Sequence, residues 1–226
     1  MGEIWCFSAA GHSLEVAQYL GQALNAPVRR IGEETDAATD LAVVVFPVYC
    51  QNIPSPVIQF LSRLPAKQVV LIATYGRMGY GNVLWEGAQL TAGQVIAAAF
   101  VPTGHTYLNE KVSVNYEALQ PILDRLGDPR PAVIPKLRKW WLADLFPGFR
   151  SRIGVKLQKN QNCTQCGLCS TVCHMGAMKN GIPGKNCIRC LRCVAQCPNG
   201  AISFTCGPVL RRYLRKPRKC ETVIFL

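Results

Sequence analysis

Eight of the twelve cysteines in this chain lie between residues 163 and 197, and their spacing repeats. Each half of the repeat reads C-x2-C-x2-C-x3-C and follows an asparagine. The first half contains Cys163, Cys166, Cys169 and Cys173, and the second, 24 residues later, contains Cys187, Cys190, Cys193 and Cys197. Both halves continue into a Gly-Ala pair. A duplicated segment therefore supplies two equivalent sets of four thiols.

Four thiols at this spacing suit a [4Fe–4S] cluster. Short loops let the first three thiolates of a half reach three corners of one cubane, while the fourth crosses to the other cluster. The expected ligand sets are Cys163, Cys166, Cys169 and Cys197 for one cluster, and Cys173, Cys187, Cys190 and Cys193 for the other. Zinc is the alternative, but structural zinc sites use two separated pairs of ligands. The tandem quartets favour two [4Fe–4S] clusters and single-electron transfer.

The start of the chain and its apolar runs indicate where the protein works. The opening residues, MGEIWCFSAAG, place no basic residue before the apolar run, so they do not resemble a secretory signal. No apolar run is long enough for an integral membrane span. We therefore expect a cytoplasmic protein. A reducing compartment argues against structural disulfides, which leaves cluster ligation as the explanation for most of the cysteines.

Charge is distributed unevenly along the chain. Residues 1–128 carry 7 Lys and Arg against 11 Asp and Glu, whereas residues 129–226 carry 18 against 2. Two oxidised cubanes, each of charge about −2 with its four thiolates, offset only a small part of this excess. The basic half predicts an acidic redox protein, such as a ferredoxin, as partner. Nucleic acid is the less favoured alternative for a basic surface, and we expect none.

The first 128 residues alternate between apolar runs and helical patterns, as α/β domains do. Strands are expected at residues 4–7, 27–31, 41–46, 68–74 and 95–101, and helices at residues 13–24, from Ser55 as the cap, and at 82–90 and 116–126. Five strands with helical crossovers predict a doubly wound, five-stranded parallel sheet. Such sheets bind ligands beyond the carboxyl ends of their strands.

Two further parts follow this domain. Residues 129–158 begin with a proline-rich stretch and continue into a basic, aromatic segment, 136–146, that we expect to be a short helix. It packs between domains in the favoured interpretation, or lies on a membrane surface in the alternative. Residues 159–226 are expected to form a small α+β two-cluster ferredoxin domain with a basic tail.

The loop after the first strand has the composition of an anion site. Residues 8–13 read Ser-Ala-Ala-Gly-His-Ser and lead into a helix, so backbone N–H groups and the two serine hydroxyls point toward one place. A serine and glycine turn of this kind is equally often only a helix cap.

With these loops and the cysteine repeat in view, the whole sequence resembles the flavodoxin–ferredoxin fusion family. The resemblance implies a flavodoxin-like FMN-binding domain whose phosphate loop is Ser8, Ala9, Ala10, Gly11, His12 and Ser13. Ala10 and His12 stand where the family has Thr and Asn, so phosphate binding should be weaker. The flavin ring would be held by Pro47, Val48, Tyr49, Cys50, Asn52, Thr74, Tyr75, Gly76, Tyr80 and Gly81, with Tyr49, Tyr75 or Tyr80 stacking on it.

FMN and cubanes in one chain would convert between one-electron and two-electron chemistry. The favoured hypothesis is a ferredoxin-linked reductase with a small-molecule substrate at the flavin. One alternative is an electron-transfer protein that serves a partner enzyme. A second, motivated by Ala10 and His12, is a flavin-free ferredoxin with a vestigial flavodoxin-like domain. The chain has no Gly-x-Gly-x-x-Gly fingerprint, so NAD(P)H is not an expected donor.

Overall fold

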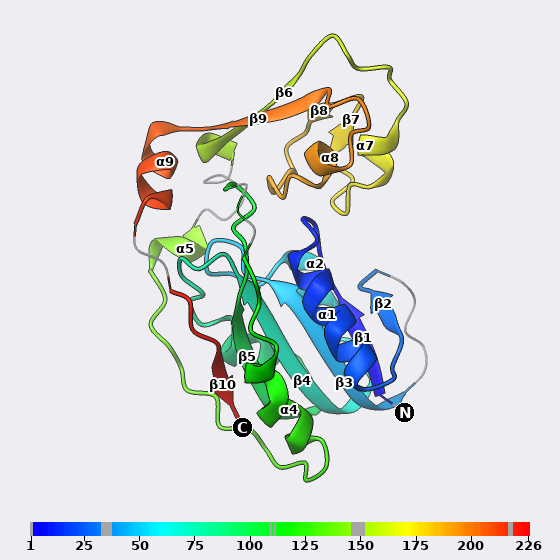
Figure 1. The fold of residues 1–226 in the computed structure, drawn as a ribbon, viewed down its shortest axis with the longest axis vertical. Coiled ribbons are helices and arrows are strands. Elements are labelled where there is room, and N and C mark those ends of the chain that lie inside the picture. Colours follow the sequence, from blue (N-terminus) through cyan, green and yellow to red (C-terminus); the bar gives the residue numbers. More distant parts are fainter. Residues whose placement is uncertain (1, 33–37, 109, 111, 146–151, 217–218) are drawn as a thin grey trace. The chain divides into compact units, whose positions relative to one another are not determined.

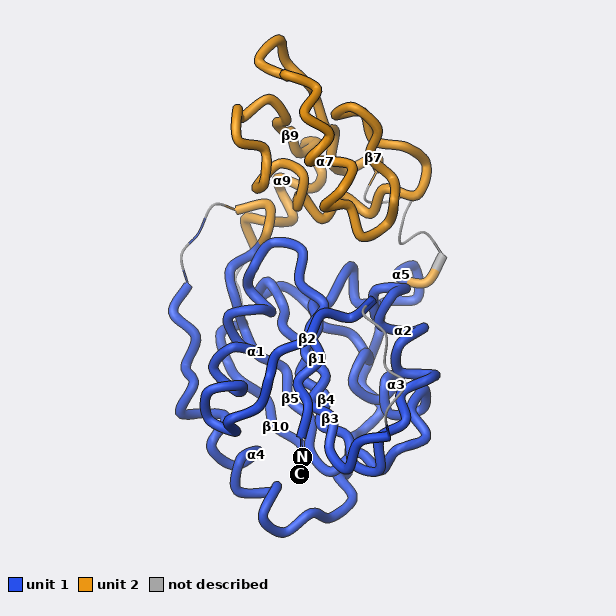
Figure 2. Tube along the Cα trace, turned by 90° about the vertical axis from the view of Figure 1, so that its right-hand side faces the viewer, with its two compact units in different colours: residues 1–105, 109–143, 218–226 blue, residues 106–108, 144–217 orange. Residues whose placement is uncertain are grey.

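The computed structural model describes residues 2–32, 38–108, 110, 112–145, 152–216 and 219–226. The chain divides into two compact units (Figures 1 and 2). Unit 1 comprises residues 1–105, 109–143 and 218–226, and unit 2 comprises residues 106–108 and 144–217. This division differs from the predicted domains 1–128, 129–158 and 159–226. Residues up to 143 and the last nine residues belong with the first sheet because they bond to it, as described below.

Unit 1 is built on a six-stranded sheet of order β10-β5-β4-β3-β1-β2. The strands are β1 (Gly2–Cys6), β2 (Val28–Arg30), β3 (Thr39–Pro47), β4 (Ala66–Tyr75), β5 (Gln94–Pro102) and β10 (Val223–Phe225). The first five are parallel, and their order is that of flavodoxin-like sheets. The mixed α/β architecture is confirmed, and the sheet is compatible with a flavodoxin-like domain.

The sixth strand corrects the prediction of a five-stranded sheet. β10 pairs antiparallel with β5, with Ile224 opposite Ala99. The C-terminal residues were expected in the basic tail of the ferredoxin domain, but their apolar side chains are half-buried against unit 1. Pairing with β5 satisfies backbone groups that an edge strand would otherwise expose.

The core of unit 1 lies on both faces of this sheet, because its central strands are continuous apolar runs. One face packs Trp5, Phe46 and Phe100 under α2 (Ser55–Leu61) and α3 (Val83–Leu90). The other packs beneath α1 (His12–Ala23), the 3-10 turn η1 (Glu117–Leu119) and α4 (Gln120–Arg125). Helices on both faces make the sheet doubly wound, as expected.

Two local predictions about helices are wrong. Ser55 is the first residue of α2 rather than its cap, which is Pro54. Residues 136–140 are not helical, and only α5 (Leu142–Leu145) forms within the segment 136–146, whose last residue lies outside the described residues. Residues before α5 instead bond to unit 1, beginning with the N–H group of Ala132, which donates to the Val95 carbonyl at 2.8 Å.

Unit 2 has little regular structure. Its longest ribbon pairs β6 (Val155–Lys159) with β9 (Ile202–Cys206), and a second pairs β7 (Met178–Lys179) with β8 (Ile182–Pro183). The helices α7 (Leu168–Thr171), α8 (Arg192–Ala195) and α9 (Pro208–Leu214) are short. Among the described residues of this unit, the core cluster consists of Met178, Cys193 and Ile202, with neighbouring cysteines packed against it. So small a core leaves unit 2 dependent on further stabilisation, such as bound metal.

Among the described residues, no helix combines the length and the apolar character that crossing a membrane requires.

Candidate metal centre

The cysteine repeat of the sequence is also a repeat of backbone conformation. In each half, three residues adopt a positive φ, at positions 24 residues apart: Gln165 (57°), Gly167 (77°) and Gly176 (56°), and then Arg189 (57°), Leu191 (61°) and Gly200 (56°). A one-turn helix follows the second of these in both halves, α7 in the first and α8 in the second. Sharp left-handed turns between successive cysteines fold each loop so that its thiols face one side.

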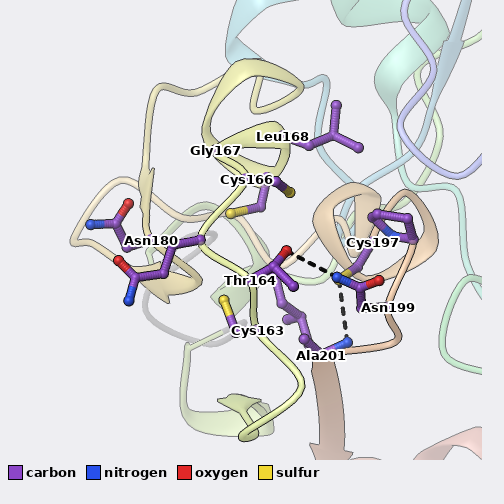
Figure 3. A pocket seen from close by; sticks show the side chains of 13 residues that line it. Cys163, Thr164, Cys166, Gly167, Leu168, Asn180, Cys197, Asn199 and Ala201 are labelled. Carbon is purple, nitrogen blue, oxygen red and sulfur yellow. Dashed lines mark hydrogen bonds between the residues drawn. The ribbon is translucent and has the colours of Figure 1, made fainter.

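A pocket in unit 2 brings cysteines of the two halves together (Figure 3). Its lining includes Cys163, Cys166 and Cys169 from the first half and Cys197 from the second. These four form the set that the crossover spacing predicts for one cluster. The side-chain amide of Asn199 donates to the Thr164 hydroxyl at 3.0 Å and ties the two halves at the pocket edge (Figure 3).

The other predicted set, Cys173, Cys187, Cys190 and Cys193, is also gathered in unit 2. Burial first, and then the nearby thiols of Cys190, Cys187 and Cys173, together raise the pKa of the Cys193 thiol to about 12. Burial likewise raises the pKa of Cys190, and Cys187 and Cys173 add to it. Cys190 and Cys193 therefore need a bound cation before they can be thiolates.

Backbone N–H groups point at one sulfur of each set. The N–H group of Ala177 donates to Sγ of Cys173, and that of Ala201 donates to Sγ of Cys197, both at 3.2 Å. The bond from Ala201 is the main reason that the pKa of Cys197 is lowered. Such donors stabilise thiolate charge and tune iron–sulfur centres. These two hydrogen bonds were not predicted. The repeated Gly-Ala pairs do indicate their positions, because the left-handed glycine turns the N–H group of the following alanine back toward the cysteine.

The residues present fit iron–sulfur clusters. Among the described residues, no three His, Cys, Asp or Glu side chains are grouped as a single metal ion would need. The pocket cysteines instead surround a space. In a cubane each thiolate bonds a different iron, so ligands placed around a space suit a cluster, and the N–H donors suit its negative charge.

A comparison with protein families matches part of this unit. The family described as 4Fe-4S binding domain matches residues 185–203, which contain Cys187, Cys190, Cys193 and Cys197. This segment is therefore similar to a 4Fe-4S binding domain. No match to the chain was found among the curated proteins. The match supports iron–sulfur electron transfer as the chemistry of this segment.

The predicted flavin loops of unit 1 lie at the carboxyl ends of β1, β3 and β4, where the strand order places a ligand crevice. The phosphate loop, however, is bonded within the protein. Ser8 Oγ accepts the N–H group of Gly11 at 3.2 Å, and Ser13 Oγ lies 2.7 Å from Thr74 Oγ1. Ala9 is buried, Ala10 is exposed, and the His12 ring packs against Gly104. Both serine hydroxyls therefore already have protein partners.

The tyrosines of the fourth-strand loop are also engaged. Tyr75 is 2% exposed, and its hydroxyl donates to the Glu221 carbonyl at 2.9 Å. Tyr80 stacks on Phe100 with ring centroids 3.9 Å apart, and its edge contact with Tyr75 has centroids 5.0 Å apart. Lys219 Nζ lies 4.7 Å from the centre of the Tyr80 ring. Both tyrosines thus belong to an aromatic cluster with Phe100, and their stacking on a flavin ring stays a prediction.

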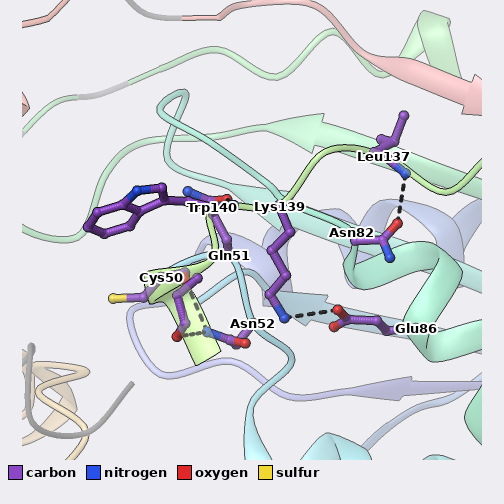
Figure 4. A network of polar contacts seen from close by, with 9 residues as sticks. Cys50, Gln51, Asn52, Asn82, Glu86, Leu137, Lys139 and Trp140 are labelled. Atoms are coloured by element: carbon purple, nitrogen blue, oxygen red, sulfur yellow. Dashed lines mark hydrogen bonds and ion pairs between the residues drawn. The ribbon is translucent and has the colours of Figure 1, made fainter. Parts of the chain in front are cut away.

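The loop after β3 is crossed by the segment that was expected to be a helix (Figure 4). The N–H group of Trp140 donates to Gln51 Oε1 at 3.1 Å, and the side-chain amide of Asn52 donates to the Ala143 carbonyl at 2.9 Å. Tyr49 and Asn52 close a tight turn in which Cys50 and Gln51 adopt positive φ angles. Cys50 itself is exposed.

The remaining predicted flavin contacts are backbone positions. The N–H group of Val48, next to Pro47, donates to the Thr74 carbonyl at 2.8 Å. A Cβ on Gly76 would lie 2.6 Å from the His105 ring, and one on Gly81 would lie 2.6 Å from Cβ of Gln51. These glycines admit protein neighbours. Flavin binding therefore stays a prediction from topology and resemblance.

Proposed function

We propose that this chain is an electron-transfer protein that holds two [4Fe–4S] clusters in unit 2. Cys163, Cys166, Cys169 and Cys197 would hold the first cluster, and Cys173, Cys187, Cys190 and Cys193 the second. The observation that carries the proposal is the pocket in which Cys197 of the second half joins three cysteines of the first. A single-cluster domain would not need this crossover.

The chain's own residues would hold the clusters and control access to them. Each bound cluster supplies the uptake and release of one electron. The N–H groups of Ala177 and Ala201 hold thiolate charge at Sγ of Cys173 and Cys197. Cys187 and Cys193 are buried and would exclude water from a second cluster bound there. Cys166 is exposed, so the first cluster would be the one that exchanges electrons with a partner.

An acidic redox protein, such as a ferredoxin, is the proposed partner. The basic residues of α9 and the turn after it are exposed: Arg211, Arg212, Arg215 and Lys216. Figure 1 shows α9 at the opposite end of the β6–β9 ribbon from α7 and α8. The five residues of β9 span about 16 Å. Because α9 lies that far from the cysteine pocket, its charges would steer a partner rather than contact it at the cluster. A reducing, cytoplasmic location is proposed for this exchange, because most of the cysteines are needed as cluster ligands.

The test is to measure iron, acid-labile sulfide and FMN per chain in protein purified without oxygen. We expect about eight irons, since two cubanes are proposed. Cys197→Ala should lose the first cluster, while Cys206→Ala, which changes a cysteine outside both sets on β9, should keep all the iron. About four irons in the unmodified protein would overturn the count of two.

A flavin-linked oxidoreductase is the second candidate. The strand order supports it, because the loops after β1 and β3 meet at the point where FMN binds in sheets of this order. In that case unit 1 would hold FMN and a small-molecule substrate above it, as in the flavodoxin–ferredoxin fusion family. Titration of the intact protein with FMN, followed by flavin fluorescence, decides between the candidates. Saturable binding of one FMN per chain supports the oxidoreductase, and no binding supports the flavin-free electron-transfer protein.

A further inference from the structure

The two halves of the cysteine repeat share a fold but differ in charge. Residues 161–176 contain no Lys, Arg, Asp or Glu, whereas residues 185–200 contain three basic residues and no acidic one. Lys185, Arg189 and Arg192 replace Gln161, Gln165 and Leu168 of the first half. The backbone at the central pair, Gln165 and Arg189, is the same, with a φ of 57° at both. Charge is therefore one clear difference between the two sites, beside the deeper burial of Cys187 and Cys193.

Arg189 is fixed at both its backbone and its side chain. It lies between Cys187 and Cys190, and its Nε donates to the Val155 carbonyl at 3.0 Å. Its own carbonyl accepts a hydrogen bond from the Tyr107 hydroxyl at 2.9 Å. Its Nη1 is buried and has no hydrogen-bond partner among the described residues. A buried N–H group without an acceptor is costly, so a negatively charged group bound nearby would stabilise this side chain.

A fixed cation at this position favours reduction. A cubane with four thiolates goes from a charge of about −2 to about −3 when it takes up an electron, so a nearby positive charge stabilises the reduced form more. Burial of Cys187 and Cys193 opposes the extra charge, but it also reduces the screening of Arg189. The first cluster has neutral Gln165 at the equivalent position.

We propose that Arg189 raises the reduction potential of the second cluster above that of the first, so that the second cluster takes up the first electron. The proposal rests on the binding of two clusters proposed above. It makes the exposed first cluster the entry point and the buried second cluster the place where the electron resides. Arg189 acts here as a positioning residue, through its charge and its N–H groups, and does not itself exchange electrons.

The test is a redox titration of the intact protein, followed by electron paramagnetic resonance of the reduced clusters. Arg189→Gln introduces the residue that the first half has at this position. It should lower the higher midpoint by about 59 mV, which is about a tenfold decrease in the one-electron reduction constant. Arg189→Lys keeps the charge and should retain most of the effect. Gln165→Arg is the matched control in the other half, and it should raise the lower midpoint by a similar amount. Both Arg189→Gln and Gln165→Arg should bring the two midpoints closer together.

Iron content separates the failure of this proposal from that of the proposed function. About four irons in the unmodified protein would refute two clusters. With about eight irons, equal midpoints in Arg189→Gln and the unmodified protein would overturn the role of Arg189. If the two midpoints lie farther apart in either variant than in the unmodified protein, the first cluster is the one reduced first, and the proposal is overturned as well. If Arg189→Gln loses iron, the test passes to Gln165→Arg, which leaves the second half unchanged. A lower midpoint that does not move in Gln165→Arg then counts against the proposal.

Discussion

Ser13 Oγ and Thr74 Oγ1 lie 2.7 Å apart, and both side chains are 2% exposed. The bond joins the first turn of α1 to the end of β4, two elements that are 61 residues apart in the chain. The resemblance to flavodoxin-like domains places Ser13 in the phosphate loop and Thr74 among the residues that would hold the flavin. In this chain each is the main partner of the other, so their first role is to hold the loop after β1 against the sheet.

Removing one of these hydroxyls should therefore destabilise unit 1. We expect Ser13→Ala to lower the free energy of unfolding by about 1–3 kcal/mol, because the Thr74 hydroxyl stays buried and loses its short hydrogen bond. The double variant Ser13→Ala, Thr74→Val replaces both partners by apolar groups and should recover part of the loss. Urea unfolding followed by circular dichroism measures both. If Ser13→Ala has unchanged stability but has lost affinity for FMN, the structural role of this hydroxyl is contradicted.

The raised pKa of Tyr75 predicts that unit 1 loses stability at alkaline pH. Burial raises the pKa of Tyr75 to about 12, whereas an unfolded tyrosine titrates near pH 10. Because the folded pKa is the higher one, the stabilisation is complete below pH 10 and is lost as the pH rises toward 12. Buried Cys6, whose pKa burial also raises to about 12, loses its contribution in a window that begins nearer pH 9.

Tyr75→Phe should change both the stability and its pH dependence. At pH 8 the variant lacks the hydrogen bond to the Glu221 carbonyl, so we expect a loss of about 0.5–1.5 kcal/mol. Between pH 8 and pH 11 the unmodified protein should lose more stability than the variant, since only it has the tyrosine to ionise. Urea midpoints at the two pH values measure this, with Tyr213→Phe in unit 2 as control. Identical pH dependence in both proteins would refute the role of Tyr75.

The strands of unit 1 could be predicted because burial on both faces makes them continuous apolar runs. β10 could not, because it has three residues and its partner β5 lies more than a hundred residues earlier in the chain. The segment 136–146 was predicted as a helix from its composition. It extends instead because the N–H groups of Leu137 and Trp140 find acceptors on Asn82 and Gln51, which no local pattern indicates.

The candidate site divides in the same way. The two cysteine sets follow from spacing, because short loops limit which thiols can reach one cluster. The charge difference between Gln165 and Arg189 can also be read by aligning the two halves. The hydrogen bonds that fix Arg189 could not be predicted from the sequence, since Val155 and Tyr107 lie outside the repeat. The orientation of Tyr75 likewise depends on Glu221 in the last residues of the chain.

The packing of β10 predicts that the C-terminus stabilises unit 1. Phe225 makes an edge contact with buried Phe100, with ring centroids 6.2 Å apart. Phe225→Ala should cost about 1–3 kcal/mol of unfolding free energy, less than a fully buried phenylalanine because Phe225 is only half-buried. Leu226→Ala, at the exposed last residue, should cost under about 0.5 kcal/mol. Urea unfolding compares them, and equal losses in the two variants would show that Phe225 does not hold the strand.

The exposed basic residues of α9 predict salt-dependent association with an acidic carrier. Reversing Arg211 and Arg212 to Glu should slow electron transfer from a reduced, negatively charged ferredoxin by about tenfold or more at low ionic strength. The difference should shrink as salt screens the charges, because the Debye length falls to about 8 Å at 0.15 M. Cluster midpoints should not move, since α9 lies at the far end of the β6–β9 ribbon.

The matched control reverses two exposed basic residues of unit 1, Arg63 and Lys67, which makes the same change in net charge. Stopped-flow rates over a range of ionic strength distinguish a local basic surface from net charge alone. If the control slows transfer as much as the α9 variant, the overall charge steers the partner and α9 has no special part. If neither variant changes the rate, the acidic partner is the wrong class, and an uncharged surface near exposed Cys166 becomes the site to test.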